Sequence, residues 1–412
     1  MFAVVLPPAA VSSAAPSQSA VASLQLSDGA VAYANEGDIW VYDVSSGRTQ
    51  RLTSHPLRSP FADSQPRFLD PDQIVFARRN VGTGSASVMR ASISSGGSPI
   101  KVVDLPHDES SLPGLPLDVS PDGRLLAFLD DAGESSLIYT LHVFDLASTH
   151  EVARRDLGSI FASDFFCGDY VEGGLPREPR NDVVRWSPDG ESILVVEDLE
   201  GRIYVSRSDG RDVTPSFHGN GPAEWSVDGR TVFFHVWNKE VSELHALDVS
   251  NGSSRTLGAP HAKEGLAVSP DGARLAYDDG EAASSLWVYE LADGSERRIG
   301  PNLAFPLWLT PTSALATSIR AKPIRCEDGG SPVTVSSSRD AIGSKMVDIK
   351  TGATTTSILR STADADVLHK RAARSGPVGL IALGVATMVA LGVMVWRGTR
   401  RQVVQKVPTD AA

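Results

Sequence analysis

Cysteine and clustered basic residues are scarce in this chain. Only two of its 412 residues are cysteine, so the disulfide-dense class of small secreted domains is excluded. The formal net charge is −12, and no stripe of lysine and arginine interrupts the acidic background. Sequence-independent binding to nucleic acid needs such a stripe to displace condensed counterions. We therefore expect a solvated acidic surface and no nucleic-acid partner.

Motifs of hydrolases, metal sites and phosphate loops are also missing. No Gly-x-Ser-x-Gly elbow is present, and the nine histidines include no His-x-x-x-His pair. His142, His235 and His245 lie within or beside predicted strands, where we interpret them as structural. Asp70 and Asp72 are spaced like the start of a calcium loop, but its Gly and closing Glu are absent. The sequence therefore predicts no catalytic residue, no metal and no cofactor.

Turn residues, in contrast, are abundant, with 36 Gly and 26 Pro, and they recur in a phrase. The phrase is a short apolar strand, a Ser-Pro-Asp-Gly turn and a second apolar strand. Five copies are clear and two are degenerate, which gives seven. The copies are LQLSDGAVAYA from Leu24, RFLDPDQIVFA from Arg67, LDVSPDGRLLAFL from Leu117, VRWSPDGESILVV from Val184, AEWSVDGRTVFFH from Ala223, LAVSPDGARLAYD from Leu266 and LWLTPTSALAT from Leu307.

A second phrase follows each copy and places a Gly four residues after a polar turn residue. Only the copy at Asp145 lacks this Gly. The other pairs are Asp43 with Gly47, Ser92 with Gly96, Ser206 with Gly210, Asp248 with Gly252, Glu290 with Gly294, and Asp348 with Gly352.

Both phrases predict tight turns between antiparallel strands. Proline presets a negative φ, aspartate bonds its own backbone and glycine supplies a positive φ. Each repeat therefore contains four strands, a to d, and repeats of this length must stack to bury both faces of their sheets. We predict an all-β propeller of seven blades over residues 21–359. Six blades is the alternative, if the copy at Leu307 only completes the first blade, and a linear β-solenoid is a weaker one.

The same geometry explains the repeated acids. Asp28, Asp122, Asp189, Asp228 and Asp271 occupy equivalent turns in different blades, so they cannot converge as paired catalytic carboxylates. The glycine-rich stretch from Gly82 lacks the Lys of a phosphate loop and is interpreted as a hairpin connection.

The Ser-Pro-Asp-Gly phrase and the segment IWVYDVSSGRTQRLT from Ile39 resemble the WD-repeat-like blades of the TolB-like propeller family. The resemblance covers most of the chain and implies the fold with good specificity. Its implications for function are broad, because such propellers serve as periplasmic docking proteins, as gates beside peptidase domains, and as lyases. It therefore implies a binding platform first.

The carboxyl-terminal region contains the longest apolar run. Residues Pro377–Trp396 carry no charge and are long enough for a helix to cross a hydrocarbon core about 30 Å thick. Basic residues flank both ends, at Lys370, Arg371 and Arg374 and again from Arg397. We predict a linker over 360–376, one transmembrane helix over 377–396 and a basic cytoplasmic tail over 397–412, with the lipid bilayer as a partner.

Residues 1–20 resemble the remnant of a signal peptide. A short apolar stretch is followed by small residues, with an Ala-x-Ala at Ala20 to Ala22, but a basic start is missing. Export would place the propeller outside the cytoplasm and the tail inside, in a single-pass cell-membrane protein. The alternative is a cytosolic tail-anchored scaffold, and basic flanks on both sides of the helix do not decide between the two.

Two insertions are predicted on one face of the ring, at Gly158–Asp182 and Ser318–Ser344. They carry Cys167 and Cys326, for which we predict a disulfide in an oxidising compartment, with two free thiols as the alternative. The first insertion also carries four aromatic residues that we expect to bind a partner, namely Phe161, Phe165, Phe166 and Tyr170, although aromatics in long loops often pack within the loop itself.

The leading functional hypothesis is a membrane-anchored, extracytoplasmic, non-catalytic module that binds a protein, peptide or glycan on the insertion face. The alternative is a propeller-fold lyase or hydrolase, which would need His, Arg and acidic groups converging near the centre of the ring. No such cluster is evident in the sequence.

Overall fold

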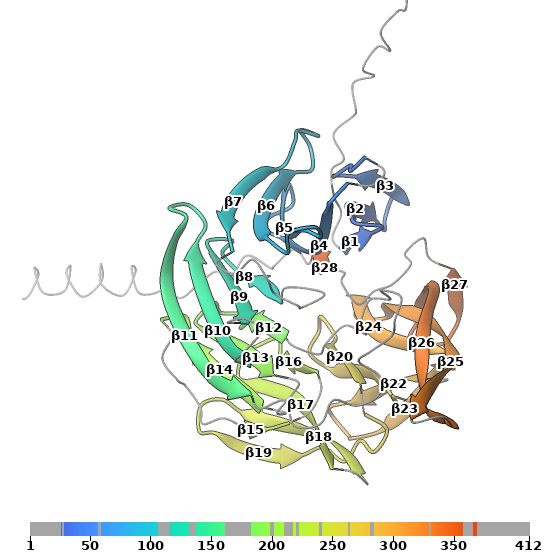
Figure 1. Ribbon diagram of the computed structural model, residues 1–412. Helices are drawn as coiled ribbons and strands as arrows, with labels where there is room; N and C mark the ends of the chain where they lie inside the picture. The colour runs from blue at the N-terminus through green and yellow to red at the C-terminus, as the bar shows by residue number, and fades with distance from the viewer. Residues whose placement is uncertain are drawn as a thin grey trace, which may run out of the picture. The chain divides into compact units, whose positions relative to one another are not determined.

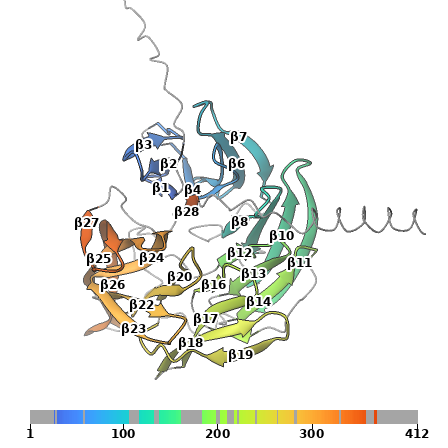
Figure 2. The ribbon, with the colours of Figure 1, turned by 180° about the vertical axis from the view of Figure 1, so that it is seen from behind.

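Seven four-stranded antiparallel sheets form a ring in the computed structural model, as predicted. Figures 1 and 2 show the sheets radiating from a common axis, with β4, β8, β12, β16, β20, β24 and β28 innermost. The structure describes residues 26, 29–56, 59–105, 116–131, 137–160, 183–197, 202–209, 217–219, 222–238, 241–262, 264–280, 284–328, 331–356 and 366–368.

The strands of each blade follow one another outward from the axis. Blade 1 is β28 (Asp366–Leu368), β1 (Ala30–Asn35), β2 (Asp38–Asp43) and β3 (Arg48–Arg51). Blade 2 is β4 (Phe61–Phe68), β5 (Gln73–Asn80), β6 (Ala86–Ser92) and β7 (Ile100–Asp104). Blade 3 is β8 (Leu117–Val119), β9 (Leu125–Asp131), β10 (Leu137–Asp145) and β11 (His150–Ile160). Blade 4 is β12 (Val183–Trp186), β13 (Ser192–Glu197), β14 (Arg202–Arg207) and β15 (Phe217–His218).

The remaining blades have the same order. Blade 5 is β16 (Ala223–Trp225), β17 (Thr231–Asn238), β18 (Val241–Asp248) and β19 (Ser253–Thr256). Blade 6 is β20 (Glu264–Val268), β21 (Arg274–Asp278), β22 (Ser285–Glu290) and β23 (Glu296–Pro301). Blade 7 is β24 (Leu303–Thr310), β25 (Ser313–Asp328), β26 (Ser331–Asp348) and β27 (Thr354–Thr356).

The ring is closed by a strand from the far end of the chain. β28 pairs with β1, with Val367 opposite Val31 and Asp366 opposite Ala32. Asp366–Leu368 fall in the stretch assigned to the linker, so the linker boundary predicted at residue 360 lies too early, and in the described part of the chain the innermost strand of blade 1 comes from this segment. The copy at Leu307 forms a blade of its own, so the six-blade alternative is wrong.

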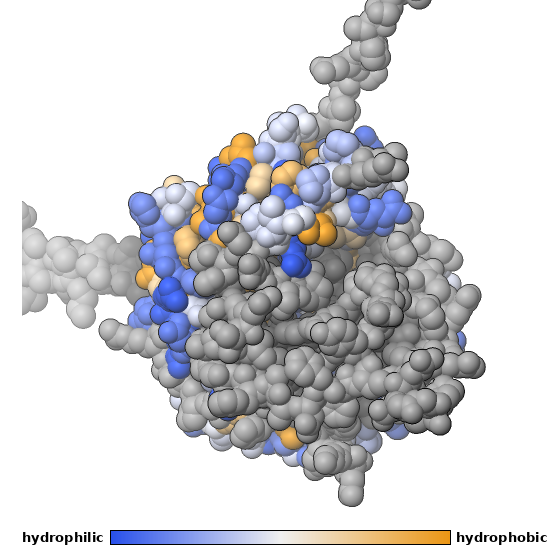
Figure 3. All heavy atoms as spheres, viewed as in Figure 1, coloured by the Kyte–Doolittle hydropathy of each residue, from blue (hydrophilic) through white to orange (hydrophobic). Residues whose placement is uncertain are grey.

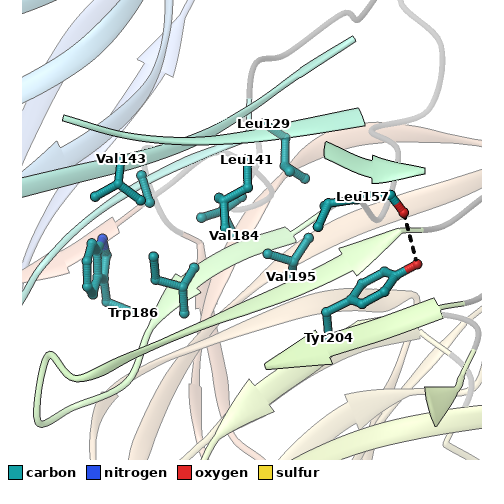
Figure 4. Close-up of a cluster of buried hydrophobic side chains, with 10 residues drawn as sticks. Leu129, Leu141, Val143, Leu157, Val184, Trp186, Val195 and Tyr204 are labelled. Carbon is teal, nitrogen blue, oxygen red and sulfur yellow. Dashed lines mark hydrogen bonds between the residues drawn. The ribbon is translucent and has the colours of Figure 1, made fainter. Parts of the chain in front are cut away.

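The hydrophobic core is divided among seven junctions between neighbouring blades. Figure 4 shows the junction of blades 3 and 4, where Leu141 and Val143 face Val184 and Trp186. The junction of blades 7 and 1 holds the smallest described set of buried apolar residues: Val31, Tyr33, Leu309 and Leu315. Val367 of β28 packs against this small set, and burial of apolar surface is the main stabilising term, so β28 contributes to the closure of the ring.

The Ser-Pro-Asp-Gly turns form as predicted, with the same hydrogen bonds in blades 3 to 6. In blade 4 the Ser187 hydroxyl donates to Asp189 at 2.5 Å, and the same carboxylate accepts from the Glu191 N–H at 3.0 Å. Gly190 has a φ of 77°, a region that favours glycine. A Cβ there would also lie 3.3 Å from Pro121 in the turn of the preceding blade. The repeated acids therefore cap turns, and Asp70 does the same for the N–H groups of Asp72 and Gln73.

The turn that lacks its glycine keeps the glycine conformation. Thr149 has a φ of 58°, and its N–H donates to the Asp145 carbonyl at 2.8 Å. Gly252 occupies the equivalent turn of blade 5, with a φ of 72° and a 2.9 Å bond to the Asp248 carbonyl. A left-handed conformation costs an L residue roughly 1–2 kcal/mol, so Thr149 is a local source of strain.

We expect Thr149→Gly to raise the free energy of unfolding by about 1 kcal/mol, because the strain outweighs the extra backbone entropy that glycine loses on folding. Denaturant unfolding of the purified protein measures this. The matched control is Gly252→Thr, which we expect to destabilise by a similar amount. Equal stability of all three proteins would contradict the assignment of strain to Thr149.

The outer strands carry exposed charges. On β11, Arg154 and Asp156 expose 58% and 65% of their side chains, and hydrophilic residues are frequent along this outer side of blade 3 in Figure 3. Charges on an edge strand disfavour pairing with another chain. We interpret the charged outer rim as protection against edge-to-edge aggregation.

The chain separates into two compact units, Met1–Leu368 and His369–Ala412. Within the described residues there is no helix with the length and apolarity needed to cross a bilayer. The predicted span Pro377–Trp396 and the signal-peptide remnant over 1–20 lie outside the described residues. Both stay predictions.

Candidate functional site

Five charged residues occupy equivalent positions on the innermost strands of blades 1 to 5. In blade order they are Asp366, Arg67, Asp118, Arg185 and Glu224, so the sign of the charge alternates from blade to blade. The strand registers establish the equivalence, because each residue lies opposite the same position of its neighbouring strand. We call this set the charged belt.

Two acids of the charged belt cap main-chain N–H groups of the following blade. Asp366 Oδ2 accepts from the Phe68 N–H of blade 2 at 2.9 Å, and Asp118 Oδ2 accepts from the Trp186 N–H of blade 4 at 2.8 Å. An innermost strand is a sheet edge, so it presents N–H groups that its own sheet leaves unpaired. The carboxylates satisfy these donors and join successive blades.

The two arginines contact the acid of the following blade. Arg67 Nε lies 3.6 Å from Asp118 Oδ1, and Arg185 Nε lies 3.9 Å from Glu224 Oε2. The Arg67 side chain is 7% exposed, and its guanidinium also donates to the Pro66 carbonyl at 2.8 Å and to Gln65 at 3.2 Å. Each of the first four residues of the charged belt therefore contacts the following blade.

The charged belt ends at blade 5. Glu224 Oε1 accepts a hydrogen bond at 3.1 Å from the N–H of Trp225, the next residue of the same strand. The equivalent positions of blades 6 and 7 hold Ala267 and Leu307, which carry no charge and are half-buried. Three carboxyl groups and two guanidiniums thus form an incomplete ring with an acid at each end.

Three tryptophans reinforce the contacts between blades at the same level. The indole N–H of Trp186 donates to the Asp118 carbonyl at 3.3 Å, and that of Trp225 donates to the Arg185 carbonyl at 3.1 Å. Trp308 makes the equivalent bond to the Ala267 carbonyl at 3.1 Å. Each tryptophan is at most 5% exposed and also belongs to the core at its junction.

Burial raises the pKa of Asp118 and of Glu224 above their ordinary values, while the positive charge of Arg185 opposes the shift in both. The charges of Asp118 and Arg67 also act on Glu224, and that of Asp366 acts on Asp118, so the charged belt behaves as one electrostatic group. A carboxyl group with a raised pKa keeps its proton more readily, which is the property required of a general acid.

The raised pKa predicts a pH effect on stability. A group whose pKa is higher in the folded state contributes stability below its unfolded pKa, near 4.3 for glutamate, and loses it as the pH rises through the folded value. We expect Glu224→Gln to remove this loss, so the variant gains stability relative to the wild type between pH 4.5 and pH 7. Urea unfolding across this range measures the difference.

Asp248→Asn provides a control of opposite sign. Hydrogen bonds from Ser250 lower the pKa of Asp248, so its contribution is present above the unfolded value and is lost as the pH falls. A Glu224→Gln variant that loses stability relative to wild type as the pH rises would contradict the assignment.

A second polar cluster joins blades 1 and 2. His55 Nδ1 lies 2.8 Å from Asp38 Oδ1, and His55 Nε2 lies 3.8 Å from Asp63 Oδ2. The fully buried Asp63 side chain also accepts two bonds from Arg78, at 2.7 and 2.8 Å, and this pairing raises the pKa of Arg78. Arg51 bonds Asp38 on the other side. These groups neutralise one another, so we interpret the cluster as a structural contact between the blades.

The two faces of the ring differ in regularity. The face with the a-to-b and c-to-d turns, which we call the turn face, repeats nearly the same turns around the ring. On the opposite face, which we call the variable face, β1 and β2 end at the pair Asn35 and Asp38, whereas β25 and β26 stay paired to Asp328 and Ser331. The predicted insertion at Ser318–Ser344 is therefore a long hairpin that extends from the variable face.

Most of the predicted site residues lie outside the described residues. This applies to Cys167 and to the aromatics Phe161, Phe165, Phe166 and Tyr170, while Cys326 is described only as a backbone position of β25, opposite Val333. The disulfide and the aromatic partner site therefore stay predictions. His142, His235 and His245 lie in β10, β17 and β18, and no group of residues that could hold a metal ion occurs in the described part of the chain.

The charged belt is not among the sites predicted from the sequence. The triplets PRF, LDV, VRW and AEW show the alternation of Arg67, Asp118, Arg185 and Glu224 at their middle position, and the strand registers set blade 2 in line with the others. Asp366 carries no such signal, because it lies outside every recognisable copy of the phrase.

No protein-family model matches the chain, and no curated protein sequence matches it. Many solved structures do match. TolB from Acinetobacter baumannii is 17% identical with a TM-score of 0.42, over 66% of this chain and 63% of TolB. An oligogalacturonate lyase in complex with manganese is 14% identical with a TM-score of 0.47, over 72% of this chain and 81% of the lyase.

A functionally unknown protein from Desulfotomaculum acetoxidans DSM 771 is 11% identical with a TM-score of 0.51, over 82% of this chain and 99% of that protein. This chain spans less than two thirds of the length of the Acinetobacter TolB. At such low identities these likenesses concern the fold alone. The chain is a seven-bladed β-propeller with distant structural similarity to TolB-like propellers.

Proposed function

We propose that this protein is a non-catalytic binding module that recognises a protein, peptide or glycan with its variable face. The observation that carries the proposal is the contrast between the two faces. The turn face is uniform, whereas connections on the variable face range from the single residue Asn302 between β23 and β24 to the segment 161–182 between β11 and β12. Rigid scaffolds commonly carry their binding residues on variable loops of this kind.

The proposal includes a membrane location. Pro377–Trp396 would span the cell membrane once, with the propeller outside the cytoplasm and residues 397–412 inside. A disulfide between Cys167 and Cys326 would fit this compartment. Thiol labelling of intact cells with an impermeant reagent, with and without reductant, tests the location. Two free cysteines that react only after lysis would favour the cytosolic tail-anchored alternative.

A lyase or hydrolase is the second candidate. The charged belt brings arginines and carboxyl groups together, and the raised pKa of Asp118 and Glu224 suits a general acid. The contacts of the charged belt favour a structural role, however, because Asp118 caps the Trp186 N–H and Arg67 is almost fully buried. A binding module is therefore the better account of this geometry.

Binding of the full-length protein in nanodiscs to glycan and peptide arrays tests the proposal. The decisive variant replaces Ile319–Ile342 of the blade 7 hairpin with the two residues Glu-Gly, the sequence that joins β1 to β2 at Glu36 and Gly37, so that the pair Ser318 and Gly343 flanks the new turn. We expect it to lose at least tenfold in affinity for the ligand, or to lose binding altogether, with cooperative unfolding retained.

Asn251→Ala in the c-to-d turn of blade 5 is the matched control, because it changes the turn face. We expect it to bind like the wild type. Unchanged binding by the shortened hairpin together with loss in other variable-face variants would move the site elsewhere on that face. Chemical conversion of a bound ligand, detected by mass spectrometry, would sink the non-catalytic proposal.

A further inference from the structure

The long hairpin of blade 7 has one strand edge that no described strand covers. β26 pairs with β25 along its whole length, Ser331–Asp348. On its other edge, β26 pairs with β27 only over Lys345–Val347. Over the rest of its length β26 is therefore the outermost described strand of blade 7. An edge strand presents a row of N–H and C=O groups that can pair with another extended chain.

The strand registers show which main-chain groups point to this open edge. The Asp348 N–H donates at 2.9 Å to the carbonyl of Ala353, which lies next to β27. Asp348 lies opposite Ser313 of β25, so this pair directs its main-chain groups away from each other, and opposite pairs alternate in this respect along an antiparallel ladder. The alternation along β25 is unbroken from Ser313 to Pro323, because the extra residue of the register shift lies in β26.

Every second residue of β25 from Ser313 to Pro323 therefore points its main-chain groups away from β26. Pro323 itself agrees with this assignment, because a proline has no N–H and is tolerated in a strand where that position faces outward. Three residues of β26 lie opposite such positions in the hairpin: Ser337, Arg339 and Ala341. Their N–H and C=O groups point to the open edge.

The two edges of the hairpin differ in sequence. The β25 edge from Arg320 to Arg325 contains three basic residues and a proline, and both features hinder pairing with another strand. The β26 edge has no charged residue and no proline from Val333 to Ser338, and the next two residues, Arg339 and Asp340, have opposite charges. Of the two edges, the β26 edge therefore has the weaker protection against pairing.

The segment that follows β27 is too short to occupy this part of the edge. β27 ends at Thr356, opposite Lys345, and the innermost strand of blade 1 begins at Asp366. The nine residues between them span at most about 32 Å. Ser337 lies roughly 25 Å along β26 from Lys345, so a segment that followed β26 to Ser337 would not reach back to the axis of the ring. This segment is therefore excluded as the occupant.

Charge favours an acidic peptide as the occupant. Residues Ile319–Lys345 include five basic and three acidic residues, a net charge of +2 in a chain whose formal charge is −12. The hairpin is therefore locally basic and attracts acidic groups. A second copy of this chain would bring a further charge of −12 to the contact, and a glycan lacks the evenly spaced amide groups that complete a strand ladder.

We propose that the open edge of β26, from Ser337 to Ala341, binds an extended acidic peptide segment of a partner protein as an added strand in line with β27. This inference rests on the proposed function and assigns it a ligand class and a binding mode. An extended peptide that joins an exposed sheet edge gains affinity from main-chain hydrogen bonds. Outward N–H and C=O groups at every second residue match the spacing of such a strand.

Fluorescence anisotropy of the full-length protein in nanodiscs tests the inference with a library of acetylated octapeptides. Each member alternates β-branched residues and ends in either glutamates or lysines, and a glycan array is tested in parallel. We expect the glutamate peptides to bind at least threefold more tightly than their lysine counterparts. Methylation of every second amide of the tightest peptide should abolish binding in one of the two patterns and spare it in the other, because only alternate amides face β26.

A pair of proline variants tests the edge itself. Ser337→Pro removes one N–H from the open edge and places a ring where the peptide would lie, so we expect at least a tenfold loss of affinity. Ser337→Ala keeps the N–H and should bind like the wild type. Ala321→Pro is the matched control, because it makes the same change on the outer edge of β25, and it should also bind normally. Hydrogen exchange of the Lys322 and Ile324 amides, which face β26, should stay slow in both proline variants.

Several outcomes would overturn the inference. Wild-type affinity in Ser337→Pro, or an equal loss in Ala321→Pro, would do so, while loss of binding in the shortened hairpin would leave the proposed function standing. Fast exchange of Lys322 and Ile324 in Ser337→Pro would contradict the assignment of its N–H to the open edge. Self-association that Ser337→Pro removes, without peptide binding, would assign the edge to a second copy of this chain. If no octapeptide binds, the inference fails, and the glycan array decides the proposed function separately.

Discussion

Deletion of Asp366–Leu368 is expected to open the ring and to lower the free energy of unfolding by more than about 4 kcal/mol, a loss at the extreme of what small changes cause. The deletion removes the innermost strand of blade 1 and the bond from the Phe68 N–H to Asp366. It also exposes the smallest of the seven core junctions, between blades 7 and 1. Denaturant unfolding measures the loss.

Hydrogen exchange locates the effect of this deletion. The strands of blades 1 and 7 should exchange first, because local opening begins where packing is lost. Deletion of Asp410–Ala412, three residues of the tail, is the matched control and should change nothing. A graded series separates the strand from its side chain, since Asp366→Ala should cost about 1–3 kcal/mol by leaving the Phe68 N–H unpaired. Uniform protection in the deletion variant would show that β28 does not close the ring.

Trp225→Ala is expected to destabilise the protein by about 3–5 kcal/mol, the usual cost of truncating a buried aromatic residue. Trp225 is 4% exposed and packs at the junction of blades 4 and 5. Its indole N–H also bonds the Arg185 carbonyl. The substitution therefore removes packing and a hydrogen bond between blades together, and denaturant unfolding measures the sum.

Trp225→Phe separates these two contributions. It keeps most of the apolar volume but leaves the Arg185 carbonyl without its donor, so we expect a loss of about 1–3 kcal/mol. The control is Trp287→Phe, because the Trp287 indole bonds Asp279 of its own blade and is only half-buried. Equal losses for the two phenylalanine variants would argue against a special role for the bond between blades.

Local turn chemistry explains why the fold could be predicted so fully. The capping serine, proline, aspartate and glycine act within a few residues of one another, so the hairpins are readable from short segments. Even the exception at Asp145 follows the pattern, because the surrounding strands hold Thr149 in the conformation that glycine adopts elsewhere. Repetition of such units then leaves a ring as the natural way to bury both faces of each sheet.

The closing strand and the charged belt depend on contacts between distant segments. Asp366–Leu368 show no Ser-Pro-Asp-Gly turn, because the turn of blade 1 lies near Gly29 at the other end of the chain. Asp366 and Phe68 are joined although 298 residues separate them. No local sequence pattern predicts such a pairing. The start of the linker, predicted at residue 360, therefore lies before the closing strand Asp366–Leu368.

The sequence by itself determined the blade, its turns and the number of repeats, because these follow from interactions between residues close in the chain. Only the tertiary structure decided how the ring closes and which side chains of different blades meet. Asp366, Arg67, Asp118, Arg185 and Glu224 form one electrostatic group because the ring brings their strands around a common axis. The physical reason is that charge interactions act through space, at distances that sequence separation does not reveal.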